Sequence, residues 1–208
     1  MAATELEPIV APESARPRFG VFALVIGLAL GIVAVDQLAK WLVVTNLPEG
    51  VSVPVIGEFL QFHFVRNPGA AFSLGIGATW IFAIVAVAVA VVIVVFARRI
   101  RSLAWATVFG MLLGGTIGNL IDRLFREPGF GQGAVIDFVS IWGLPFIFNI
   151  ADIAITGSVA VLILLTLFGR GLDGSRPRRA AIDPAAQNAT GQASAEDGDA
   201  PARSDDDA

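Results

Sequence analysis

The chain contains no cysteine, and His63 is its only histidine. The absence of cysteine excludes disulfides, thiolate metal sites and thiol nucleophiles. One imidazole would have to supply every ring nitrogen of a histidine-based metal site or catalytic triad, which disfavours both. We therefore expect neither a metal nor another cofactor.

Charged residues are also scarce. They make up 15% of the 208 residues, whereas hydrophobic residues make up 55%; a soluble domain has about 25% charged residues. Most of the acidic residues lie near the two ends, so the net charge of −4 says little about what the middle of the chain binds. This composition excludes an ordinary globular enzyme, a nucleic-acid-binding protein and a coiled coil, and it predicts an integral membrane protein.

Four apolar stretches are long enough to cross a bilayer, which takes about 20 residues: 19–44, 74–97, 102–121 and 144–168. The predicted fold class is an all-α membrane protein with four transmembrane helices and a small extracytoplasmic β-sheet and loop. The membrane domain is expected at 19–170, between a disordered N-terminal segment, 1–18, and a disordered acidic tail, 171–208. The first stretch is long and lacks a small-residue cleavage site, which favours a retained anchor over a signal peptide.

Arginines predict the orientation of the chain in the membrane. They precede the first stretch, join the second to the third and follow the fourth, so the positive-inside rule places both termini in the cytoplasm. Segments 45–73 and 123–143 then lie outside. In the first of these, 51–56 and 59–65 have the β-branched and aromatic content of a hairpin, and 125–133 is typical of a Gly/Pro loop.

Ionisable residues inside the predicted helices lie at a common depth. With a rise of 1.5 Å per residue, Asp36 lies about 25 Å along the first helix, and Asn119 and Asp122 lie about 25–30 Å along the third. Asp152 lies about 10–12 Å from the outer end of the fourth. Three helices thus bring polar groups to the same outer layer, where they must face one another or a wet cavity.

Some of these residues have purely structural interpretations. Asp36 and Lys40, four residues apart, can form an ion pair, and Asp122 with Arg123 can form a helix-end cluster. We interpret His63 as structural and the four tryptophans as interfacial anchors: Trp41, Trp80, Trp105 and Trp142.

Asp152 is harder to explain structurally, because apolar residues surround it and no basic residue is near in sequence. Such a carboxylate is either protonated or functional. Asp137, in AVIDFVS just before the fourth stretch, is the carboxylate best placed to meet it. We therefore predict an aspartic dyad that shares one proton. Its charged member would activate water, and the other would donate to the scissile carbonyl oxygen.

Five segments together resemble the bacterial lipoprotein signal peptidases (signal peptidase II), aspartic proteases of the inner membrane. These segments are DQLAK (36–40), RNPGAAFSL (66–74), GGTIGNLIDR (114–123), VIDFV (135–139) and FNIADIAITGS (148–158). The resemblance covers about residues 20–170. One departure is the stretch between Asp122 and Asp137, which is longer than in many members of the family.

The resemblance implies a membrane aspartic endopeptidase that removes the signal peptide from diacylglyceryl-modified prolipoproteins by cleaving before the lipidated cysteine. Asp137 and Asp152 match its catalytic pair. The positions implied to bind substrate or support the site are Asp36, Lys40, Asn67, Gly69, Ala70, Asn119, Asp122, Arg123 and Asn149. The expected partners are diacylated prolipoproteins and membrane lipid, with no nucleic acid, and we expect a monomer.

Two other classes of protein also explain intramembrane carboxylates. A small transporter or proton-coupled channel could use Asp36, Asp122 and Asp152 as a relay, but the inner halves of the helices are apolar, whereas a relay needs charges through the full depth. A non-catalytic scaffold would leave the buried Asp152 without a role.

Overall fold

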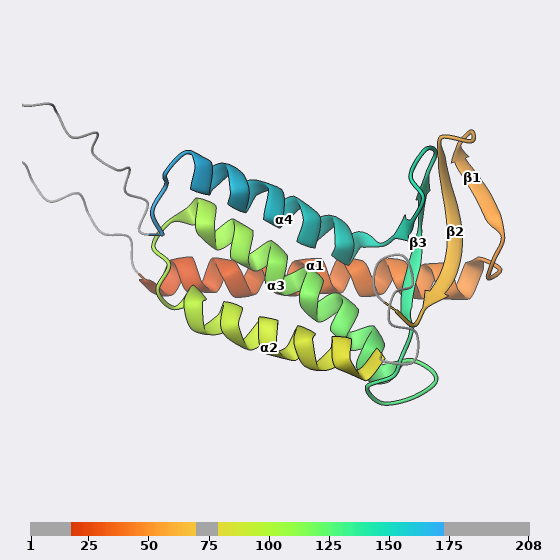
Figure 1. Ribbon diagram of the computed structural model, residues 1–208, viewed down its shortest axis with the longest axis horizontal. Helices are drawn as coiled ribbons and strands as arrows, with labels where there is room; N and C mark the ends of the chain where they lie inside the picture. Colours follow the sequence, from red (N-terminus) through yellow and green to blue (C-terminus); the bar gives the residue numbers. More distant parts are fainter. Residues whose placement is uncertain (1–17, 70–78, 173–208) are drawn as a thin grey trace, which may run out of the picture. The chain divides into compact units, whose positions relative to one another are not determined.

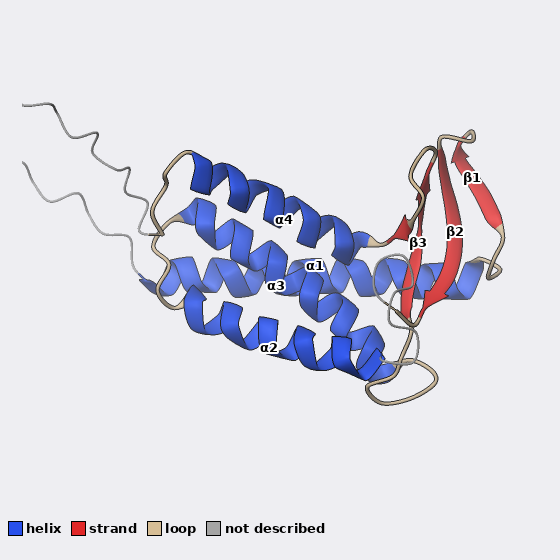
Figure 2. Cartoon of the chain, viewed as in Figure 1, coloured by secondary structure: helices blue, strands red, loops and turns tan. Residues whose placement is uncertain are grey.

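The computed structural model describes residues 18–69 and 79–172. Four helices lie side by side, and a small sheet stands at one end of them (Figures 1 and 2). The helices are α1 (Arg18–Asn46), α2 (Thr79–Ala97), α3 (Leu103–Phe125) and α4 (Ile150–Leu167). The strands are β1 (Ser52–Ile56), β2 (Leu60–Asn67), β3 (Val135–Ile141) and β4 (Ile147–Phe148). The predicted disordered flanks lie almost wholly outside the described residues, as does the start of the second predicted span.

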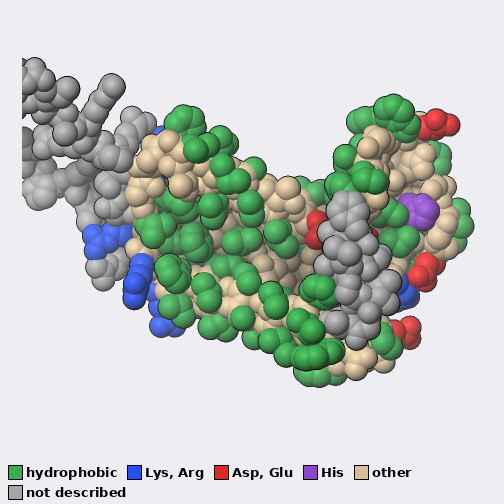
Figure 3. All heavy atoms as spheres, in the orientation of Figure 1, with side chains coloured by type: hydrophobic (Ala, Val, Ile, Leu, Met, Phe, Trp, Pro, Cys, Tyr) green, Lys and Arg blue, Asp and Glu red, His purple; other side chains and the backbone are tan. Residues whose placement is uncertain are grey.

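All four helices are long and apolar enough to cross a membrane. Large apolar side chains of α2, such as Ile84 and Val91, are more than half exposed in the isolated protein, as expected of side chains that face lipid. Figure 3 shows these apolar side chains over the helices, with basic side chains gathered at the end opposite the sheet. The predicted class, four membrane helices with a small sheet, is confirmed.

Helix α3 is central, because it packs against each of the other three helices. Glycines make this close approach possible. A Cβ at Gly114 would lie 2.8 Å from Cβ of Ile32 on α1, and one at Gly115 would lie 2.5 Å from the carbonyl oxygen of Ala151 on α4. Small residues allow the backbones of membrane helices to approach closely, so these glycines determine how near α1 and α4 come to α3.

The sheet is antiparallel with strand order β1-β2-β3-β4. Phe64 of β2 and Ile136 and Phe138 of β3 pack with Val43, near the end of α1, in one buried cluster. The predicted hairpin of β1 and β2 is confirmed. The other two strands were not predicted, because β3 pairs with a strand about 70 residues earlier and β4 has only two residues.

The fourth helix begins later than predicted. Residues 144–149 form a turn, β4 and the helix cap, and α4 starts at Ile150. Asn149 is the N-cap: its side chain accepts from the backbone N–H of Asp152, and the Asp152 carboxylate accepts from the Asn149 N–H, a reciprocal capping box. Asp152 therefore lies in the first turn of α4, and the predicted depth of 10–12 Å from the helix end was wrong.

One predicted tryptophan anchor was also wrong. Trp105 is 8% exposed and packs in the core between the helices, where its indole N–H donates to the carbonyl of Arg170 at 3.1 Å. The other three tryptophans are at least half exposed, as an interfacial position requires.

We predict that Gly115→Ala lowers the stability of the protein in detergent by about 1–3 kcal/mol, the usual effect of overpacking. The added methyl group would meet the backbone of α4, which cannot move aside as a flexible side chain can. Gly27→Ala on α1 is the matched control, since nothing lies within 4 Å of its new Cβ. Thermal unfolding should separate the two variants, and equal melting temperatures would contradict this account of the packing.

Candidate active site

A cavity of about 980 Å³ lies where the helices meet the sheet. The space-filling view shows a hollow in this region, with acidic side-chain atoms at its edge (Figure 3). Its walls come from β2, β3, the turn before α4, and the halves of α3 and α4 nearest the sheet. The predicted site residues that line it are Asn67, Gly69, Asn119, Arg123, Asp137 and Asp152.

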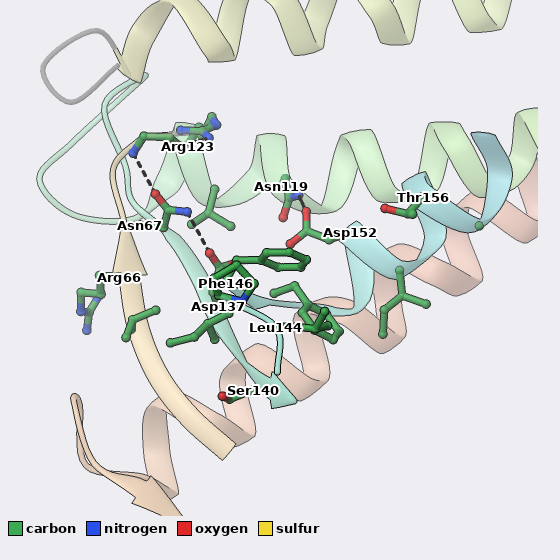
Figure 4. Close-up of a pocket in the computed structure, with 18 residues that line it drawn as sticks. Arg66, Asn67, Asn119, Arg123, Asp137, Ser140, Leu144, Phe146, Asp152 and Thr156 are labelled. Atoms are coloured by element: carbon green, nitrogen blue, oxygen red, sulfur yellow. Dashed lines mark hydrogen bonds between the residues drawn. The ribbon is translucent and has the colours of Figure 1, made fainter. Parts of the chain in front are cut away.

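The two carboxylates of the predicted dyad both line this cavity, and amide groups bind all four of their oxygens. Figure 4 shows the contacts of Asn67 with Asp137 and of Asn119 with Asp152. Asp137 accepts from Asn149 Nδ2 at 2.7 Å and from Asn67 Nδ2 at 2.9 Å. Asp152 accepts from Asn119 Nδ2 at 2.8 Å and from the backbone N–H of Asn149 at 3.1 Å. Asn149 thus binds both carboxylates, one through its side chain and one through its backbone.

A second hydrogen bond fixes each of these amide side chains. Asn119 Oδ1 accepts from Lys40 Nζ at 2.9 Å and from Asn149 Nδ2 at 3.1 Å. Asn149 Oδ1 accepts from the Asp152 N–H at 3.0 Å, and Asn67 Oδ1 accepts from the Gly69 N–H at 3.0 Å. Because each oxygen accepts one of these bonds, each NH₂ group must point toward a carboxylate.

Behind this amide layer lies a fully buried ionic cluster. Lys40 Nζ lies 2.8 Å from Asp36 and 2.7 Å from Asp122, and neither aspartate is exposed. Asp36 also accepts from the Ala151 N–H of α4 at 2.9 Å, and Asp122 accepts from the Ile136 N–H of β3 at 3.2 Å. The cluster thus joins α1, α3, α4 and β3, which agrees with the structural interpretation of Asp36 and Lys40.

The sequence left open a helix-end cluster of Asp122 with Arg123, but the two side chains do not pair with each other. Asp122 pairs with Lys40 and with Arg126, one turn further along α3. Gln37 also contributes, since its Nε2 lies 3.2 Å from Asp36 and 3.3 Å from Asp122. Sequence analysis missed both Gln37 and Arg126, although Arg126 lies four residues from Asp122, the spacing of a helical ion pair.

Arg123 points away from the ionic cluster. Its Nη2 donates to the carbonyl of Gly69 at 2.7 Å, and its guanidinium stands 5.2 Å from the ring centre of Phe82 on α2. Its Nη1 is buried and has no hydrogen-bond partner within the described part of the chain. An unsatisfied cationic donor in a cavity wall is a ready contact for a ligand carbonyl.

The sequence also predicts a structural role for His63 and a role in the site for Ala70. His63 is in β2, where its ring hydrogen-bonds Ser52 at 2.8 Å on the exposed side of the hairpin and does not line the cavity. Ala70 lies outside the described residues. Across residues 18–69 and 79–172 no group of three or more His, Asp or Glu side chains is placed to hold a metal ion.

Burial raises the pKa of Asp137 from 3.8 to about 6. Asp137 is 3% exposed, and the negative charge of Asp152 raises the pKa further. The amides of Asn67 and Asn149 and the charge of Lys40 oppose this rise but do not cancel it. A carboxyl group that titrates near neutral pH beside a second carboxylate is suited to general acid–base chemistry.

Four membrane helices, with a cavity lined by two aspartates at one end, describe a multi-pass membrane protein with a candidate active site. A family model described as signal peptidase (SPase) II matches residues 28–168. The chain is 51% identical over 186 residues to the lipoprotein signal peptidase of Leifsonia xyli subsp. xyli, covering 89% of this chain and 86% of that protein. It is 46% identical over 145 residues to that of Rhodococcus jostii, covering 70% and 73%.

A solved structure described as a bacterial membrane enzyme is also similar. Its TM-score is 0.64 at 30% identity, and the match covers 76% of this chain and 94% of that one. The chain belongs to the signal peptidase II family. It is therefore a membrane peptidase, which decides against the transporter and scaffold interpretations.

The raised pKa of Asp137 predicts how stability depends on pH. Because this pKa is about 6 in the folded protein and 3.8 ordinarily, the folded state binds more protons between these values. The stabilising contribution is therefore present below about pH 4 and is lost as pH rises through 6, by at most about 3 kcal/mol. Melting temperatures in detergent should fall more steeply from pH 5 to 7 for the wild type than for Asp137→Asn. Parallel curves would contradict the prediction.

Proposed function

We propose that this peptidase removes signal peptides from prolipoproteins by hydrolysing the bond before a diacylglyceryl-modified cysteine, with Asp137 and Asp152 as the catalytic pair. The observation that carries the proposal is that both carboxylates line one cavity at the sheet end of the membrane helices. Amide donors on every carboxylate oxygen support it, because they hold the pair in place before substrate arrives.

In the proposed reaction Asp137 carries the shared proton and Asp152 is ionised. The raised pKa of Asp137 supports this assignment. Asp152 takes a proton from water as its oxygen attacks the scissile carbonyl carbon, and Asp137 donates its proton to the carbonyl oxygen. When the tetrahedral intermediate collapses, Asp152 gives its proton to the amide nitrogen, Asp137 takes back a proton from a hydroxyl group of the intermediate, and the C–N bond breaks. The signal peptide leaves with a new carboxylate, and the lipidated cysteine has a free amino group.

Other cavity residues are proposed to hold the peptide. Asn67 and Gly69 lie beside Asp137 at the end of β2, and Arg123 has a buried N–H group with no partner in the described part of the chain. The Arg123 Nη1 group can bind a substrate carbonyl on the sheet side of the carboxylate pair, whereas Asn67 and Gly69 support the site by holding Asp137. The substrate itself is a membrane-anchored chain, which suits a cavity whose wall continues along a membrane helix.

The proposed orientation places both termini in the cytoplasm and the sheet outside. The start of α1, the α2–α3 connection and the end of α4 lie together at the end opposite the sheet (Figure 1), where the Arg101 N–H donates to the carbonyl of Leu172. Arg98, Arg99 and Arg101 lie at this end, and basic residues mark the cytoplasmic side.

We predict that Asp137→Asn and Asp152→Asn each abolish cleavage of a diacylated prolipoprotein in detergent, because each removes one of the two acid–base groups. Both variants should insert and melt cooperatively, and EDTA should leave wild-type activity unchanged. Substantial turnover by either variant would refute the dyad. So would a loss of activity with EDTA that added metal restores.

The orientation is tested by labelling single cysteines, which is simple because the chain has no native cysteine. Arg99→Cys and Glu58→Cys place the thiol at exposed positions at opposite ends of the molecule. A membrane-impermeant maleimide should label Glu58→Cys in intact spheroplasts and should label Arg99→Cys only after lysis. The reverse pattern would invert the topology.

A further inference from the structure

The cavity continues beyond the dyad along α4. Ile153, Thr156 and Gly157 line it, and their spacing places them with Asp152 on one face of the helix. At 1.5 Å per residue, Thr156 and Gly157 lie about 6 and 7.5 Å further along α4 than Asp152, toward the middle of the membrane. The opposite face of α4, with Ala154, Ser158 and Leu165, is buried against the other helices.

The hydroxyl group of Thr156 differs from those of Thr107 on α3 and of Ser158 and Thr166 on α4. Thr107 and Thr166 donate to the carbonyl four residues earlier, at 3.0 and 2.8 Å, and Ser158 donates to Ile155 at 2.6 Å. Thr156 makes no hydrogen bond with any described residue, and its hydroxyl points toward the Asp152 side of the cavity (Figure 4). In lipid surroundings an unsatisfied hydroxyl is unfavourable, so Thr156 offers a donor to a ligand.

Gly157 is not required by packing among the described residues. A Cβ at this position would meet only the terminal methyl carbon of Met111, at 3.4 Å, an ordinary contact with a flexible side chain. A Cβ at Gly115 or Gly118 would instead meet fixed groups at 2.5 and 2.8 Å. Glycine is a weak helix former, and at position 157 it leaves a notch in the cavity wall.

We propose that Thr156 and Gly157 form the subsite for the diacylglyceryl group of the substrate, with Thr156 Oγ1 donating to a glycerol ester carbonyl and the Gly157 notch admitting an acyl chain. This inference rests on the proposed function, because the lipidated cysteine adjoins the bond that is cleaved and its glycerol must lie close to the dyad. An ester carbonyl accepts hydrogen bonds but donates none, which matches a hydroxyl donor. The buried Nη1 of Arg123 lies in the wall of the same cavity and has no partner among residues 18–69 and 79–172, so it remains available for the peptide.

Two substrates test the role of Thr156: a lipidated peptide with ester-linked chains, and the same peptide with ether-linked chains of equal length. Thr156→Val should raise KM for the ester substrate about fivefold, the effect of one neutral hydrogen bond, and leave kcat unchanged. Neither KM nor kcat should change for the ether substrate, and Thr156→Ser should behave as the wild type. An equal effect on both substrates, or no effect on either, would overturn the role of Thr156.

Chain length tests the role of Gly157. Gly157→Leu should raise KM about tenfold for a dipalmitoyl substrate and less than about twofold for a diacetyl one. Gly27→Leu is the control, because it adds the same side chain at an open position on α1 that does not line the cavity. A rise in KM that does not depend on chain length, or that is equal for Gly157→Leu and Gly27→Leu, would overturn the proposed role of Gly157. If Gly157→Leu does not fold, Gly157→Ala should shift KM in the same direction to a smaller degree, and an unchanged KM there would overturn it.

Equilibrium binding of a fluorescent S-diacylglyceryl-cysteine amide to the full chain separates this inference from the proposed function. If the wild type cleaves no lipidated peptide but binds this probe, and both substitutions weaken binding, the subsite stands and the proposed function fails. If the wild type cleaves and both variants bind and turn over substrate as it does, the subsite fails and the function stands.

Discussion

The Lys40 ammonium group joins the elements on which the rest of the structure depends. Its partners Asp36 and Asp122 bind backbone N–H groups of α4 and β3, and its third contact is Asn119. Charges within a membrane must be fully paired, and removing one member of a buried ion pair costs about 3–5 kcal/mol. The cluster is therefore complete only when α1, α3, α4 and β3 are packed in this one arrangement. The same arrangement brings Asp137 and Asp152 to one cavity.

The same arrangement explains why the carboxylates are surrounded by donors. Three asparagines, from β2, α3 and the cap of α4, direct their NH₂ groups at the dyad because their oxygens are already occupied. A proton on either carboxyl group finds no acceptor among these amides. Because these asparagines are held by their own second hydrogen bonds, their dipoles are already oriented toward the two carboxylates.

The membrane helices could be predicted from the sequence because length and apolarity report them directly. The carboxylates could be selected because Asp152 has no basic neighbour in sequence and Asp137 lies in an apolar segment. The partner of Asp122 could not be predicted, because Lys40 is 82 residues earlier in the chain. Knowing which face of a helix a residue occupies does not identify the helix that this face contacts. Likewise, the sequence predicted Asn149 inside the fourth helix. Its position as the N-cap of α4 can be recognised only when β4 is known to end at Phe148. The pairing of β3 with β2 depends on folding of the intervening helices, which no local pattern records.

Helix α1 has 29 residues, so it is about 43 Å long, whereas the hydrocarbon core of a bilayer is about 30 Å thick. The excess carries Val43, which packs against the inner face of the sheet. The distance between the sheet and the two carboxylates is thus set by helix α1 and not by the lipid. A thinner or thicker membrane would tilt the helices as a body, and the spacing between Asn67 and Asp152 would be preserved. A peptidase built in this way can work in membranes whose thickness changes with temperature and lipid composition without readjusting its site.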